Sequence, residues 1–119
     1  RPAFLRWLMV VNAALYPTFA YSDVPERWVQ GDEQAAGQLK TGVDDHRKTL
    51  LTILEQQAVG PWFLGAQMTA LDLYFMTLRF WDPGLEWYAS HVPTLDRIGH
   101  DIAEIEPVRQ VLDQYFDPS

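Results

Sequence analysis

A chain of 119 residues with 48% hydrophobic and 21% charged residues has the length and composition of a single globular domain, which excludes a disordered segment. The absence of cysteine excludes disulfide scaffolds, thiolate zinc sites and cysteine nucleophiles within this chain, and it fits the cytoplasmic location that we expect. The net charge of −7 argues against nucleic acid and anionic membrane surfaces as partners, because both attract basic patches.

The most apolar region of the chain is interrupted by Arg6, Asn12 and Asp23. No apolar run therefore reaches the length of about 18 residues that spans a bilayer, and we expect no membrane partner. The chain begins at Arg1 rather than at methionine, which suggests a fragment of a longer protein.

The first predicted helix covers residues 2–19 and is apolar nearly all round. One face, at helical spacing, carries Phe4, Leu8, Val11 and Leu15. A second face, roughly a quarter-turn away, carries Leu5, Met9, Asn12 and Tyr16. Because a helix of this kind is buried on more than one side, the first face should meet its own bundle and the second another domain or subunit. Pro17 should kink or end the helix.

A long second helix is predicted over residues 33–58, with Asp32 as its N-cap. Its predicted core stripe, spaced by 4, 3, 4 and 3 residues, consists of Leu39, Val43, His46, Leu50 and Ile53, and Leu54 backs it. The Gly60-Pro61 pair ends this helix, and residues 62–65 are expected to be an extended connection.

Residues 68–73 predict the start of a third helix, over residues 70–81. The Thr69 hydroxyl is placed to accept from the Asp72 N–H, and the Asp72 carboxylate from the Thr69 N–H, as in a capping box. Met68 and Leu73 are placed to form the accompanying hydrophobic staple. A carboxylate in an apolar run is also a candidate general base, but the Thr-x-x-Asp spacing favours the structural role.

The remaining chain predicts a short helix or turn over 85–91, a helix that opens at Pro93, and a last helix after Pro107. The apolar face of the helix that opens at Pro93 carries Leu95, Ile98, Ile102 and Ile105. No segment alternates apolar and polar residues as a half-buried strand does. The predicted fold class is therefore all-α, a bundle of about five to six helices that forms a single helical domain over residues 1–119.

Several motifs follow one another in a distinctive order. They are a first helix with Trp7 that ends in Leu-Tyr-Pro at Pro17, a Pro-Glu-Arg turn at 25–27, Trp-Phe-Leu-Gly-Ala-Gln-Met-Thr-Ala-Leu-Asp at 62–72, a Pro-x-Leu helix at Pro93, and a Glu-Pro-Val ending. This order resembles the C-terminal helical domain of bacterial cytosolic glutathione S-transferases. The resemblance covers nearly the whole chain, and the segment 62–72 is its most specific part.

The resemblance implies a glutathione transferase C-terminal-type helical bundle, joined in the whole protein to an N-terminal thioredoxin-like domain that is absent from this chain. That domain would hold glutathione and the residue that activates its thiol, so this chain would carry no catalytic residue and would not act alone. The helical domain would bind the co-substrate, a small hydrophobic electrophile, in detoxification. The whole protein would be a homodimer, with glutathione as co-substrate and no cofactor.

The candidate substrate-binding residues are Met9, Asn12 and Tyr16, on the second face of the first helix. In the resembling family the position of Tyr16 often faces the active-site cleft, where its hydroxyl could contact glutathione or the co-substrate. The alternative is that the three residues pack on a neighbouring helix of the same bundle. Trp81 and Trp87 similarly fit either core packing or a pocket wall or dimer contact.

The three histidines, His46, His91 and His100, lack the spacing of a metal site, so no metal is expected. The alternative function is a non-catalytic protein-interaction module of the same fold, which would use the same apolar face of the first helix. A thioredoxin-like sequence upstream of Arg1 would distinguish the enzyme from the module.

Overall fold

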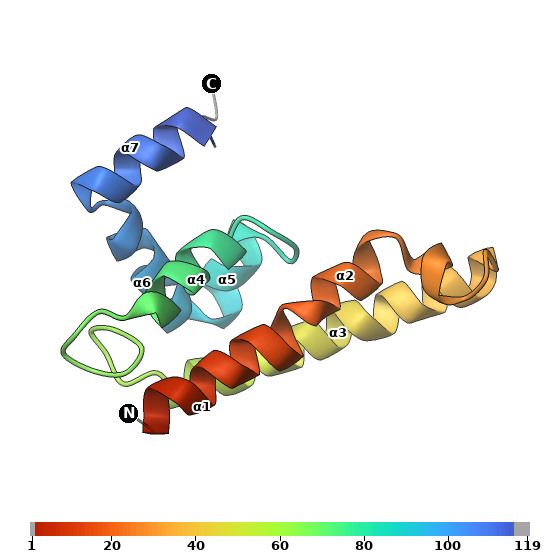
Figure 1. Cartoon of the computed structure of the whole chain (residues 1–119), viewed down its shortest axis with the longest axis horizontal. Helices are drawn as coiled ribbons and strands as arrows, with labels where there is room; N and C mark the ends of the chain where they lie inside the picture. Colours follow the sequence, from red (N-terminus) through yellow and green to blue (C-terminus); the bar gives the residue numbers. More distant parts are fainter. Residues whose placement is uncertain (1, 116–119) are drawn as a thin grey trace. The chain divides into compact units, whose positions relative to one another are not determined.

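The structure, a computed structural model, describes residues 2–115, apart from the side chains of residues 112, 113 and 115. Over these residues the chain forms six helices, with the interrupted first helix counted once, a short 3₁₀ turn and no regular strand, which confirms the predicted all-α fold class (Figure 1). The chain divides into two compact units, Arg1–Gln56 and Gln57–Ser119. The single domain over residues 1–119 stays a prediction.

The first helix of the first unit is interrupted by a wider turn. It consists of α1 (Pro2–Val10), the π-helical turn η1 (Val11–Leu15) and α2 (Pro17–Asp23). In η1 the Tyr16 N–H donates to the Val11 carbonyl, five residues back, at 2.8 Å. The expected end near Phe19 is wrong, because Pro17 occupies the first turn of α2, where a missing N–H costs little.

The two faces of the first helix differ in burial as predicted. Val11 and Leu15 are fully buried, and Phe4 and Leu8 are half-buried. The second face is exposed, at 57% for Leu5, 66% for Met9 and 45% for Tyr16, and Asn12 is exposed with them.

A short connection returns the chain from α2 to α3. The 3₁₀ turn η2 (Pro25–Trp28) leads to Gln30 and Gly31, which both have positive φ values, 55° and 82°. Asp32 then caps α3 (Glu33–Gln57), since its Oδ1 accepts from the Ala35 N–H at 3.0 Å, which confirms the predicted N-cap. Helix α3 runs back alongside α2 (Figure 1).

The buried face of α3 differs from the predicted stripe. The buried residues are Ala36, Arg47, Leu51 and Leu54. In the predicted stripe Leu39, Val43 and Leu50 are half-buried, whereas His46 and Ile53 are exposed. The centre of the buried face therefore lies roughly 80° around the helix from that of the predicted one. The prediction followed apolar spacing alone, which leaves Arg47 off the stripe, but Arg47 is 0% exposed.

The second unit contains four helices: α4 (Ala70–Leu78), α5 (Leu85–His91), α6 (Pro93–Ala103) and α7 (Glu106–Tyr115). Helix α6 contacts each of the other three. The fully buried side chains of this unit include Phe63, Leu71, Phe75, Tyr88, Leu95, Ile98 and Ile102. Of the predicted apolar face of α6, Ile105 lies beyond the helix and is half-buried. Helix α4 ends before the predicted residue 81, because the Phe80 and Trp81 N–H groups bond to carbonyls three residues back.

Residues 62–65 form a closed turn, not the expected extended connection. The Trp62 N–H donates to the Gly65 carbonyl at 2.9 Å, and the Gly65 N–H donates back to the Trp62 carbonyl at 3.2 Å. This turn places Phe63, which is fully buried, against Phe75, with the ring centres 5.1 Å apart.

Thr69 and Asp72 form a capping box at the start of α4. The Asp72 Oδ2 accepts from the Thr69 N–H at 2.8 Å, and the Thr69 hydroxyl accepts from the Leu71 N–H at 3.2 Å. Asp72 is fully buried, and its Oδ1 also accepts from the Phe63 N–H at 2.8 Å. One carboxylate therefore fixes both the preceding turn and the helix. The side chains of Met68 and Leu73, predicted to form a staple, remain 46% and 39% exposed.

The tryptophans lie at the surface of the units. Trp28 is 50% exposed, and the other four, Trp7, Trp62, Trp81 and Trp87, are half-buried. Core packing of Trp81 and Trp87 is thus partial. Trp87 stacks on His91, with the ring centres 4.7 Å apart and an interplanar angle of 9°.

One helix of the described chain, Pro2–Asp23, is long and apolar enough to cross a membrane by length and composition. This corrects the expectation that Arg6 and Asn12 interrupt the apolar run too severely, since one charged residue inside the run does not disqualify it. A core helix of a soluble protein meets the same two criteria, so this finding alone does not assign the helix to a membrane.

Candidate functional site

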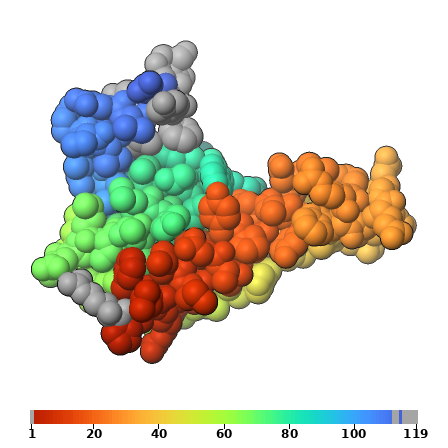
Figure 2. Space-filling model, viewed as in Figure 1, coloured from red at the N-terminus to blue at the C-terminus, as the bar shows by residue number. Residues whose placement is uncertain are grey.

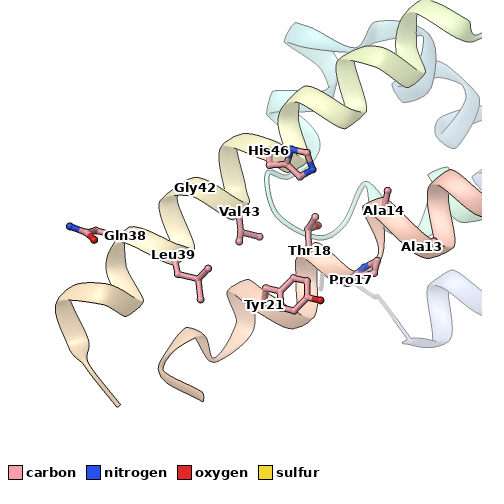
Figure 3. Close-up of a pocket in the computed structure, with 10 residues that line it drawn as sticks. All are labelled: Ala13, Ala14, Pro17, Thr18, Tyr21, Gln38, Leu39, Gly42, Val43 and His46. Carbon is pink, nitrogen blue, oxygen red and sulfur yellow. The ribbon is translucent and has the colours of Figure 1, made fainter. Parts of the chain in front are cut away.

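An open groove of about 620 Å³ lies between the first helix and α3 in the first unit (Figure 3). Small residues on both sides, among them Ala13, Ala14 and Gly42, leave this space. Leu39 and Val43 from α3 give it an apolar wall (Figure 3). Its polar lining residues are Thr18, Tyr21, Gln38 and His46. Three of the five residues of the predicted core stripe of α3, Leu39, Val43 and His46, therefore line a groove.

Arg47 forms a buried polar network with Thr18, a residue that lines the groove. Its Nε donates to the Thr18 hydroxyl at 2.9 Å, and its Nη2 donates to the Thr18 carbonyl at 2.9 Å and the Ser22 hydroxyl at 2.7 Å. Its Nη1 pairs with the Asp44 Oδ1 at 2.9 Å, and its Cζ lies 4.2 Å from the centre of the Phe19 ring. A buried guanidinium is tolerated only when it is paired and hydrogen-bonded in this way.

This network fastens the irregular turn of the first helix to α3. The Thr18 hydroxyl, which accepts from Arg47, donates in turn to the Leu15 carbonyl at 2.6 Å. Leu15 is the last residue of the π-turn, and Tyr16 follows it directly. Arg47 therefore fixes the backbone on the C-terminal side of Tyr16. Sequence reasoning missed this role, although the acidic Asp44 one turn before Arg47 was a signal for a paired arginine.

Met9, Asn12 and Tyr16 are each exposed on the first helix, and their grouping as a binding site stays a prediction. They are distinct from the ten residues that line the groove in Figure 3. The Tyr16 ring makes an edge contact with the Phe19 ring, with the ring centres 6.4 Å apart. The three side chains offer an apolar thioether, an amide and a phenol, a set that can bind a ligand with both apolar and polar parts.

The three histidines make different local contacts. His46 lines the groove, His91 stacks on Trp87, and His100 lies 3.7 Å from the Asp101 carboxylate. Among residues 2–115, no group of three or more His, Asp or Glu side chains is arranged to hold a metal ion.

Comparison with known proteins gives one relative. The chain is 35% identical over 113 residues to a protein of Escherichia coli (strain K12) described as "Uncharacterized GST-like protein YncG". The matched region covers 94% of this chain and 54% of the relative, so the chain spans about half the length of the curated relative that it matches. No protein-family model matches the chain, and no solved structure matches it.

The sequence similarity and the fold support the same family relationship. The chain is thus related to a GST-like protein over almost its whole length, and its all-α fold is consistent with a glutathione S-transferase C-terminal-like domain.

Proposed function

We propose that this chain is the co-substrate-binding helical half of a glutathione S-transferase, which conjugates glutathione to small hydrophobic electrophiles when joined to a thioredoxin-like domain. The observation that carries the proposal is the exposed second face of the first helix. Leu5, Met9 and Tyr16 are 57%, 66% and 45% exposed there, although a core face already exists on the same helix. The similarity to a GST-like protein supports the choice of reaction.

The chemistry of this face suits an electrophile that is mostly apolar. Apolar surface removed from water contributes about 25 cal/mol per Å², and a flexible thioether such as that of Met9 adapts to ligands of different shape. The Asn12 amide and the Tyr16 hydroxyl can hydrogen-bond glutathione or polar atoms of the electrophile. In this reaction the glutathione sulfur attacks the electrophilic carbon, and the thiol proton and the leaving group depart. This chain would position the electrophile for that attack.

In the whole protein, a second subunit would also cover part of this face. A contiguous apolar surface of a few hundred Å² on a soluble protein tends to be an interaction site. We propose a symmetric homodimer in which the first helix contributes to the interface, since self-complementary two-fold contacts are the commonest kind.

The test is steady-state kinetics of the natural full-length protein with glutathione and a chlorodinitrobenzene electrophile. Met9→Ala should raise KM for the electrophile about threefold to tenfold, because a buried thioether chain is lost. Tyr16→Phe should lower kcat/KM roughly tenfold if its hydroxyl contacts a reacting group. Val59→Ala, at a site that is 71% exposed in the second unit, is the control and should change neither value.

Two results would overturn the proposal. One is conjugation by the 119-residue chain alone at the rate of a whole transferase, since the thiol-activating residue would then lie within it. The other is normal conjugation by the full-length Met9 and Tyr16 variants. Absent conjugation in a full-length protein that still binds a protein partner through this face would establish the interaction module instead.

A further inference from the structure

A cluster of exposed apolar side chains lies where α2 returns to α3, away from the proposed co-substrate face along the chain. Tyr21, Val24 and Trp28 are 41%, 39% and 50% exposed, and we call these three residues the tip cluster. The turn that carries them is uncovered on the face of the molecule seen in Figure 2, where it is orange. Exposed aromatic side chains grouped in this way are typical of binding surfaces.

The tip cluster is held in a fixed arrangement. The Trp28 Nε1–H donates to the Ala20 carbonyl at 3.3 Å, and the Tyr21 and Trp28 rings meet edge to face, with their centres 5.0 Å apart. Pro25, at the start of η2, is buried. Trp28 therefore combines a large exposed surface with a restrained side chain, so little conformational entropy would be lost when a partner binds.

The backbone around the tip cluster is equally well fixed. The Gly31 N–H donates to the Glu26 carbonyl at 3.0 Å, and the Asp32 N–H donates to the Val29 carbonyl at 3.2 Å. These bonds close the turn before Asp32 caps α3. Backbone hydrogen bonds within the chain therefore hold the turn that carries the exposed aromatic rings.

The surface around the tip cluster is acidic. Residues 20–33 contain four acidic side chains against one basic side chain, a local net charge of −3. All five are exposed: Asp23, Glu26, Arg27, Asp32 and Glu33. A purely apolar partner would remove these carboxylates from water without pairing them, which is costly, and a polyanion would be repelled.

We propose that the tip cluster binds a basic segment of a protein partner. A Lys or Arg side chain of that segment would lie over the exposed part of the Trp28 indole as a cation–π pair, and Asp23 and Glu26 would pair with its neighbouring basic side chains. The occupant follows from charge complementarity, since only a cationic segment satisfies both the aromatic and the acidic parts of this surface. The proposal is independent of the proposed transferase function.

The test titrates the chain with a fluorescein-labelled peptide of alternating lysine and glycine and follows the anisotropy at low salt. A peptide of alternating glutamate and glycine serves as the ligand control. Trp28→Ala should weaken binding of the basic peptide about fivefold or more. The double variant Asp23→Asn with Glu26→Gln should weaken it by a similar factor, and added salt should weaken it further.

A matched variant separates local recognition from overall charge. Asp45→Asn with Glu86→Gln also removes two exposed carboxylates, so it brings the net charge from −7 to the same −5, but it lies outside the turn. It should leave the affinity within about twofold of the unaltered chain. If Trp28→Ala does not fold, as judged by circular dichroism, the two charge variants decide the result because all four positions are exposed.

Several outcomes would overturn the proposal. They are no binding of the basic peptide up to about 1 mM, a weak range for protein recognition, equal binding of the acidic peptide, or equal loss in the two charge variants. A dimer of the unaltered chain that Trp28→Ala converts to a monomer in sedimentation would also overturn it, since a second copy would then occupy the tip cluster.

Discussion

Gly99 lies in the middle of α6, where alanine would normally be the better residue. It is buried, and the side chain of Arg79 crosses it closely. A Cβ atom built on Gly99 would lie 2.1 Å from the Arg79 Cδ and 2.9 Å from its Nε. Arg79 cannot swing aside freely, because it is 8% exposed and its Nε and Nη2 hold the Asp96 Oδ1 at 3.1 and 3.0 Å.

Two opposing effects set the result of Gly99→Ala. Alanine in a helix interior is favoured over glycine by about 1 kcal/mol. Against this, displacing Arg79 from Asp96 breaks a largely buried ion pair and overpacks the α4–α6 contact, at a cost of about 2–4 kcal/mol. We therefore expect Gly99→Ala to lower the free energy of unfolding by about 1–3 kcal/mol.

Urea denaturation followed by circular dichroism measures this change, and Gly37→Ala is its matched control. Gly37 also lies inside a helix, α3, but it is exposed and no atom lies within 4 Å of a Cβ built there. Gly37→Ala should raise the free energy of unfolding by about 0.5–1 kcal/mol. If Gly99→Ala stabilises the chain as Gly37→Ala does, then Arg79 is not locked over Gly99 and the reasoning is refuted.

Three further predictions concern the capping box, the buried arginine and the exposed face of the first helix. In thermal melts, Asp72→Ala should lower the free energy of unfolding by about 2–4 kcal/mol, because two N–H groups lose their acceptor. Thr69→Ala should lower it by about 1 kcal/mol, and equal losses in the two variants would contradict this prediction. Arg47→Ala should lower the free energy of unfolding by about 3–5 kcal/mol in urea denaturation, and Arg47→Met by clearly less, since methionine leaves a smaller cavity than alanine; the reverse order would refute the packing argument. Leu5→Glu with Met9→Glu should give a folded monomer in sedimentation, and a monomeric unaltered chain would rule out the proposed homodimer.

Helix boundaries were predictable where a local signal specifies them. Asp32 starts α3, and the Thr69–Asp72 pair starts α4, because capping depends on residues only a few positions apart. Pro93 at the first turn of α6 is a signal of the same kind. That the first helix has a buried and an exposed side was also predictable, because a helix that is apolar nearly all round has more apolar surface than one core face needs.

Interactions between distant residues were not predictable in the same way. Arg47 is buried because Thr18 and Ser22, more than twenty positions earlier in the chain, supply acceptors for it. A prediction from apolar periodicity leaves charged side chains such as Arg47 out of the core. The buried face predicted for α3 is therefore rotated from the observed one. The second hydrogen bond of Asp72, from the Phe63 N–H, depends on how the turn at 62–65 folds. It could not be predicted from residue spacing either.

The candidate site was predictable only as an exposed face. The sequence indicated that Leu5, Met9 and Tyr16 share one side of the helix and should lie outside the core, and all three are exposed. It did not indicate the π-turn between Met9 and Tyr16, because that turn depends on one shifted hydrogen bond and not on composition. The groove beside it was missed for a similar reason, since small residues from two helices must face each other to form it.

Because the tryptophans are only partly exposed in the folded chain, their fluorescence emission can be used to follow its unfolding. Trp7 and Trp28 belong to the first unit, and Trp62, Trp81 and Trp87 to the second. Replacing the three of the second unit by phenylalanine would leave emission from the first unit alone, and replacing Trp7 and Trp28 would leave the second. Comparing the two denaturation curves with that of backbone ellipticity would then show whether the halves lose their structure in one cooperative step or in succession.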